Sequence, residues 1–345
     1  MKHAAVGLLA LMACAHSAAK REARSDLTVH DALHGVRYAL PSGTDTWQVS
    51  REGNARSVTG VEAEVSSFAM AKPSTTQQCR EQARSRLSAK ETAAANAIPA
   101  DAPRDQDTAD APSAVWSFTS GAPSAPVRNR WAFFVRGADC LVLHVTGPKD
   151  DGFAEQTFET AARTFQVLPL PPERQREVDL LAGMGFLERR EPAAALDRFE
   201  ALAAREPDNA KAHFGALMAG FELGAVAYAR ALPHGSVALR SDRELTPEQR
   251  HLALRAVGVM QLAENQVKDA AATLAELVVR SPELAEGQYN YACALARLGD
   301  AQGAIDHLRA ALRLDGELAE HARQDEDFKS LRGSAAFEQL TASPR

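Results

Sequence analysis

The sequence predicts an α+β domain, with an antiparallel sheet and two helices, followed by an all-α superhelix of repeated helix pairs. Three observations support this prediction. Between residues 26 and 168, short β-branched and aromatic runs alternate with turn residues and two helical patterns. Pro-Leu-Pro-Pro at 169–172 is typical of a stiff linker. Residues 173–345 show only helical periodicity, and their small residues recur at a 34-residue spacing.

The N-terminal residues have the three parts of an export signal. Lys2 and His3 are basic, an apolar run of about ten residues follows, and small residues come next. The run is too short to span a bilayer, which takes about 20 apolar residues. Leu11-Met12-Ala13-Cys14 resembles the bacterial lipobox, and this resemblance implies cleavage before Cys14 and acylation of that residue, palmitate included. A plain signal cleaved at Ala13-Cys14-Ala15 is the alternative.

We therefore expect a signal peptide at 1–13 and a lipid-anchored tether at 14–25. Each buried CH₂ contributes about 0.8 kcal/mol, so two or three acyl chains hold a protein on a bilayer essentially permanently. Residue 15 is Ala rather than Asp, which in lipoproteins of enteric type implies the outer membrane. The expected location is the periplasmic face of that membrane, in a bacterial cell envelope.

The α+β domain is expected to span 26–168 and to begin with three strands. They are followed by a helix, a Pro-, Ala- and Asp-rich loop, three more strands and a second helix. The expected strands are 35–40, 46–50, 61–70, 114–120, 129–137 and 139–147, the first helix is 75–97, and the mobile loop is 96–114. The second helix follows Asp151, since Ala154, Phe158, Ala161 and Phe165 are spaced as one helical stripe.

This order of elements loosely resembles the αβα sandwich of PsbP-like and DcrB-like domains, a recurrent exported module. Exported proteins also form disulfides. A Cys79–Cys140 bond would close a loop of about 60 residues and stabilise the fold by about 4 kcal/mol. The alternative is a pair of buried free thiols. Cys293 lies in a helical pattern and is expected to be a small core or groove residue.

The helical part contains spaced small residues that define its period. Gly258 and Ala292 are 34 residues apart, as are Ala270 and Ala304. The stretch 289–315 resembles a tetratricopeptide repeat (TPR), with Ala285 as position 1. Gly183 occupies position 8 of an earlier repeat, as Gly258 and Ala292 do in later ones. A degraded repeat between Gly183 and Gly258 carries an insertion within about Ala231 to Arg243. The tail, 321–340, resembles the closing segment of bacterial TPR proteins and should cover the last apolar face.

Local motifs for catalysis are scarce. His30 and His34 would share a face only on a helix, and no third metal ligand is evident. Cys140 and His144 lie on one expected strand, about 13 Å apart, too far for one ion. No Gly-rich phosphate loop, Gly-x-Ser-x-Gly or Cys-x-x-Cys is present, and a net charge of −6 gives no sign of nucleic-acid binding. We expect no cofactor, no metal site and no enzymatic activity.

The TPR resemblance implies a concave groove lined by the first helix of each repeat. Its residues here would be Leu180, Glu188, Lys211, Phe214, Arg255, Tyr289 and Arg297. This mixture suits a peptide or helix of an envelope protein. The sequence thus predicts a non-catalytic, membrane-anchored scaffold or adaptor lipoprotein. Two alternatives stay open: a periplasmic small-molecule or lipid binder that uses the α+β domain, and a hydrolase whose catalytic residues leave no local motif.

Overall fold

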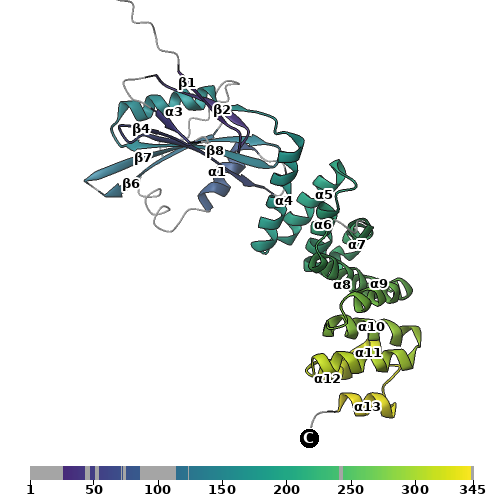
Figure 1. Cartoon of the computed structure of the whole chain (residues 1–345). Helices are drawn as coiled ribbons and strands as arrows, with labels where there is room; N and C mark the ends of the chain where they lie inside the picture. The colour runs from purple at the N-terminus through teal and green to yellow at the C-terminus, as the bar shows by residue number, and fades with distance from the viewer. Residues whose placement is uncertain are drawn as a thin grey trace, which may run out of the picture.

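The computed structural model describes residues 26–42, 47–50, 54–70, 72, 75–85, 114–122, 124–240 and 244–342. These residues form an α+β domain followed by an array of helix pairs, as the sequence predicts (Figure 1). The expected signal peptide, Cys14, the tether to residue 25 and nearly all of the 96–114 loop lie outside the described residues. Within those residues, no helix is both long and apolar enough to cross a membrane.

The α+β domain contains two antiparallel sheets. Their strands are β1 (Leu27–Asp31), β2 (Val36–Leu40), β3 (Trp47–Val49), β4 (Ala55–Ser57), β5 (Glu62–Ala69), β6 (Ala114–Ala122), β7 (Ala125–Arg136), β8 (Asp139–Pro148) and β9 (Gln166–Val167). The larger sheet has the order β3-β4-β5-β8-β7-β6, and the smaller has the order β1-β2-β9. In the larger sheet, Phe68 pairs with Cys140 and Trp116 pairs with Trp131.

Strand β8 explains why the large sheet is covered on both faces. Successive side chains of a strand point to opposite faces, and nearly all of β8 is apolar and buried. Cys140 and Val142 face α1 (Thr76–Ser85), whereas Leu141 and Leu143 face α3 (Gly152–Thr164) and the small sheet. The two helices therefore lie on opposite sides of the sheet, as Figure 1 shows.

Two side-chain contacts define the start of α3 and the turn of the first hairpin. Asp151 caps α3 by accepting a hydrogen bond from the Phe153 N–H at 2.9 Å. His30 belongs to β1 rather than to a helix, and His34 lies in the turn that follows. The Nδ1 of His34 is 2.6 Å from the buried carboxylate of Asp31, so this histidine closes the turn. Helix 75–97 is described only to residue 85.

The helical array consists of helix pairs that contact their neighbours in sequence. The helices are α4 (Pro172–Glu188), α5 (Pro192–Arg205), α6 (Ala210–Leu223), α7 (Ala225–Arg240), α8 (Pro247–Ala263), α9 (Val267–Arg280), α10 (Ala285–Leu298), α11 (Ala301–Leu314), α12 (Leu318–Gln324) and α13 (Ala335–Thr341), with a 3₁₀ turn at Glu326–Phe328. The caps agree with the sequence: Thr246 and Gln249 form a capping box at the start of α8.

The expected insertion within about Ala231 to Arg243 is mostly helical. Helix α7 continues through Pro233 to Arg240, although proline removes a backbone donor from the helix interior. Ala231, Gly235 and Ala238 are buried on one face of α7. A Cβ on Gly235 would collide with Val257 of α8, so this face approaches its neighbour very closely. Tertiary packing thus outweighs the local preference of Pro-His-Gly for a turn.

The first helix pair lies directly against the α+β domain (Figure 1). Ala69, at the end of β5, packs on the apolar cluster of α4 to α6 that includes Phe186. The guanidinium of Arg198, on α5, donates to Asp139 of β8 at 2.6 Å and lies 2.7 Å from Asp179 of α4. All three side chains are buried. One arginine therefore connects both parts of the chain.

Candidate functional site

The first helices of the pairs, α4, α6, α8 and α10, supply the candidate binding surface. The helices approach closely where the sequence places small residues. The ring of Phe199 fills the space beside Gly183, and a Cβ on Gly183 or on Gly215 would overlap that ring. Glycine at these positions therefore lets α4 and α6 close on α5.

Four of the predicted groove residues in the first two pairs remain at least partly exposed. Glu188 and Lys211 are exposed, while Leu180 and Phe214 are half-buried and pack on the apolar clusters between the helices. In the third pair, the side chain of Arg255 is partly exposed and forms an ion pair with Glu286 of α10. Its guanidinium also lies 5.8 Å from the ring centre of Phe221 on α6. These contacts bring side chains of α6, α8 and α10 together.

Two further predicted groove residues contact the chain's own C-terminal segment. Tyr289 is only 5% exposed, and its hydroxyl donates to Asp325 at 2.7 Å, while its ring meets Phe328 edge-on. The Arg297 guanidinium donates to the carbonyl of Leu262 and lies 3.4 Å from Asp327. Tyr289 is therefore not available to a partner while this segment is in place, which corrects the prediction for that residue. The tail covers the last pair, as the sequence indicates.

Exposed apolar side chains mark the open part of the surface. They are not among the groove residues that the sequence predicts. Met184 on α4 and Leu252 on α8 are 48% and 40% exposed. They stand at repeat positions 9 and 2, which the TPR resemblance also assigns to the groove. Leu181, next to Met184 on one turn of α4, is also exposed. The position numbering alone could have identified Met184 and Leu252. Partly exposed apolar side chains beside Glu188, Lys211 and Arg255 suit the apolar anchors and charged rim of a bound peptide.

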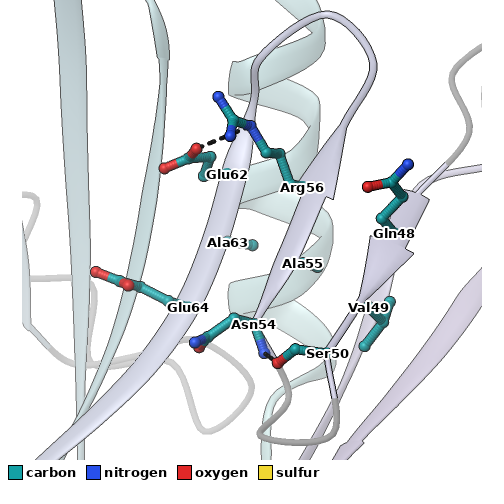
Figure 2. A pocket seen from close by; sticks show the side chains of 9 residues that line it. All are labelled: Gln48, Val49, Ser50, Asn54, Ala55, Arg56, Glu62, Ala63 and Glu64. Atoms are coloured by element: carbon teal, nitrogen blue, oxygen red, sulfur yellow. Dashed lines mark hydrogen bonds and ion pairs between the residues drawn. The ribbon is translucent and has the colours of Figure 1, made fainter.

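One hollow on the α+β domain tests the small-molecule alternative. It measures about 520 Å³ and lies over β3, β4 and β5. Figure 2 shows its charged side chains: Arg56 and Glu62 point toward each other, 3.1 Å apart, and Glu64 extends from the same strand as Glu62. Asn54 donates its backbone N–H to the Ser50 hydroxyl at one end. This hollow is open, and six of its nine lining residues have polar side chains, unlike the apolar chamber that a lipid requires.

A polar row begins at Glu64 in this hollow and continues across β8 to β7. The imidazole of His144 is 3.0 Å from Glu64 and 3.1 Å from the side-chain oxygen of Asn129. The hydrogen bond from His144 lowers the pKa of Glu64. In the described part of the chain, both ring nitrogens of His144 are thus engaged by acceptors. Neither nitrogen is placed to activate a nucleophile, which a histidine in a hydrolytic triad must do.

Cys293 lies in a second polar cluster, beneath the C-terminal segment. Its sulfur and the carboxylates of Asp325 and Asp327 lie within 4.8 Å of one another. Each carboxylate has another role: Asp325 accepts from Tyr289 and caps the 3₁₀ turn, and Asp327 faces Arg297. Burial raises the pKa of the Cys293 thiol, so this cysteine is protonated and inert at neutral pH. The cluster fastens the tail to α10.

The comparisons with known proteins concern the helical array. Residues 180–243 and 261–319 match the family model described as tetratricopeptide repeat, so the C-terminal half of the chain contains tetratricopeptide repeats. A search of curated proteins finds no significant match. These repeats are the class of structure that the helix pairs and their small residues define.

Solved structures of repeat proteins resemble about half of the chain. MamA 41-end from Desulfovibrio magneticus RS-1 is 20% identical, with 48% of this chain and 93% of that chain covered and a TM-score of 0.39. YrrB, "a TPR protein with an unusual peptide-binding site", is 16% identical, with 48% and 79% covered and a TM-score of 0.39. A further MamA structure is 11% identical, with 49% and 87% covered and a TM-score of 0.41.

Proposed function

We propose that this protein is a non-catalytic adaptor lipoprotein of the bacterial envelope. Acyl chains on Cys14 would hold it at the periplasmic face of the outer membrane. The TPR array would bind a peptide or helix of an envelope protein through the first helices of its first three repeats. The observation that carries this proposal is the open, partly apolar surface formed by Met184, Leu252 and their charged neighbours.

Three further observations support the export of the chain and the choice of the array as the binding part. Cys79 and Cys140 form a disulfide, and such bonds persist in oxidising compartments outside the cytosol. Helices α1 and α3 cover opposite faces of the sheet, in keeping with the αβα resemblance of the N-terminal domain. The polar hollow over β3 to β5 gives little support to a lipid binder.

The groove is tested by replacing exposed apolar residues on it. We expect the double variant Met184→Asp with Leu252→Asp to capture its crosslinked envelope partner about tenfold less than the unchanged chain, because burying a carboxylate at a contact is costly. Both side chains are largely exposed, so folding should be unaffected. The measurement is a quantitative crosslinking pull-down from membranes, with the full chain as bait.

The array also offers a matched control on the second helices of its repeats. Val226 on α7 and Val279 on α9 are 92% and 80% exposed. The double variant Val226→Asp with Val279→Asp adds the same charge outside the groove and should capture the partner normally. If both double variants captured the partner equally, the groove would not be the binding surface.

The anchor is tested separately. We expect Cys14→Ser to move the chain from the membrane fraction to the soluble fraction, because the acyl chains would have no attachment site. Mass spectrometry of the unchanged chain should show acyl chains on Cys14 as the first residue. A mature chain without lipid would contradict the anchor and leave the groove experiment interpretable.

A further inference from the structure

Two buried or half-buried histidines face each other at the junction of the first and second repeats. His213 lies on α6 and His234 on α7, and their Nδ1 atoms are 2.8 Å apart. The other nitrogen of His213 is 3.0 Å from the carbonyl oxygen of Pro207, in the loop between α5 and α6. The other nitrogen of His234 is 3.5 Å from the carboxylate of Glu200 on α5. One chain of contacts thus joins three helices.

The chemistry of these partners fixes where the protons are. A carbonyl oxygen only accepts, so Nε2 of His213 carries a hydrogen. The Nδ1 of a neutral His213 is then bare and accepts a hydrogen bond. His234 must therefore donate from its own Nδ1 to close the 2.8 Å contact. The tautomers follow from the network of acceptors, the usual basis for such an assignment.

The second nitrogen of His234 faces a carboxylate, which is also only an acceptor. Arg230 of α7 also donates to Glu200, so this carboxylate of α5 contacts two side chains of α7. The 2.8 Å contact thus holds one hydrogen, on Nδ1 of His234, between the two rings.

A second proton would not fit. Both Nδ1 atoms would then carry hydrogens and point them at each other across 2.8 Å. The charged groups around the pair are Glu200 and Asp197 on α5, Arg230 and Arg240 on α7, and Asp208 in the loop. Burial, and then the charge of His234, lower the pKa of His213. Full protonation therefore requires the two rings to separate.

The fourth repeat contains a similar arrangement, with a glutamine, Gln288, in the place of His213. Gln288 donates to the carbonyl of Pro282 at 3.0 Å, six residues before it, as His213 does to Pro207. The Gln288 side-chain oxygen accepts from Nδ1 of His307 at 2.7 Å. An amide takes up no proton, and His307 keeps this hydrogen bond in either charge state. Burial lowers the pKa of His307, so this junction also contains a titratable group. It differs from the first in that protonation brings no two hydrogens into conflict.

We propose that His213 and His234 form a proton-controlled latch between α6 and α7, the two helices of the second repeat, beside the contact of this repeat with α5. The latch is closed while one hydrogen lies between the two Nδ1 atoms, and it opens when both rings are protonated. It does not depend on the adaptor function proposed above. Since α4, α6 and α8 carry the exposed groove residues, opening would also change the spacing of that surface.

The direction of the pH effect follows from the lowered pKa of His213. The ordinary value is 6.5, so below about pH 6.5 the unfolded or opened chain binds more protons than the closed latch. The closed state is therefore fully stable above that pH, and its stability decreases as the pH falls toward the lowered pKa. Acid opens the latch.

The test is hydrogen–deuterium exchange of the full chain, corrected for intrinsic rates, at about pH 7.5 and about pH 5. We expect protection of α6 and α7 to fall about tenfold at the acidic pH. His213→Gln copies the arrangement of Gln288 and should abolish this fall. The α10–α11 pair serves as the internal control and should lose less protection than α6 and α7.

Two results would overturn the latch: an acid-induced loss of protection in α6 and α7 that is equal in His213→Gln, or no loss in the unchanged chain. If His213→Gln does not fold, the ¹⁵N shifts of the unchanged chain decide. At neutral pH they should show a neutral His213 with its hydrogen on Nε2, and a His234 with a hydrogen on Nδ1. A hydrogen on Nδ1 of His213 at neutral pH would contradict the proposal.

Discussion

Replacing Arg198 with alanine is expected to lower the free energy of unfolding by about 3–5 kcal/mol, because it leaves two buried carboxylates without their shared cation. Asp139 and Asp179 are both almost inaccessible to water. Arg136 and Arg205 remain near them but replace only part of the lost contact. The chain can relieve the penalty by separating its two domains, since separation would hydrate both carboxylates.

Calorimetry measures both consequences of this substitution. We expect one unfolding transition for the unchanged chain and two for Arg198→Ala, with a larger radius of gyration in solution scattering. Arg205→Ala is the matched control: it removes another partner of Asp179 from the same helix, but its side chain is half exposed. That variant should cost below about 1 kcal/mol. Similar values for the two variants would show that the buried contact does not join the domains.

Removing the Cys79–Cys140 disulfide has the second large expected effect. The bond connects α1 to β8 across 61 residues of sequence. Its loss frees that loop in the unfolded chain and should destabilise the α+β domain by about 4 kcal/mol on the chain-entropy model. The measurement is thermal or denaturant unfolding of the full chain with and without a thiol reductant. The single transition of the unchanged chain should move to a lower midpoint when the bond is reduced.

The control for this prediction is a variant that lacks the Cys79–Cys140 disulfide. The variant Cys79→Ala with Cys140→Ala should unfold at the lower midpoint with or without reductant. Cys293→Ala should keep the sensitivity to reductant, because Cys293 is the free cysteine among the described residues. If complete reduction leaves the unfolding midpoint of the unchanged chain where it was, the bond contributes little to stability.

The long, patterned elements could be predicted from the sequence. Strands β2, β5, β7 and β8 and helix α3 lie close to their expected ranges, because their apolar residues follow a strand or helix period throughout. Strands β4 and β9 have three and two residues, too few to show a period. Strand β1 was not among the predicted strands, since only two of its five residues, Leu27 and Val29, are apolar. In α7, Pro233 suggested a break that buried small residues override.

The contacts that join distant segments could not be predicted. Arg198 and Asp139 are 59 residues apart, and neither belongs to a local motif. Tyr289 held a groove position by the repeat numbering, but the numbering does not state that the tail covers it. The His213 and His234 pair carried one usable signal, since His213 and Gln288 stand at equal distances from a preceding proline. Comparing the repeats with one another would have identified that junction.

The two ends of the helical stack have one consequence for assembly. Its first helix pair is locked to the α+β domain through Arg198, and its last pair is sealed by Phe328 and Phe337, both fully enclosed. Open-ended stacks of this kind can grow into filaments by adding copies end to end. Among the described residues, both ends of the stack have their apolar layer covered, so we expect no growth of the array by addition of copies end to end.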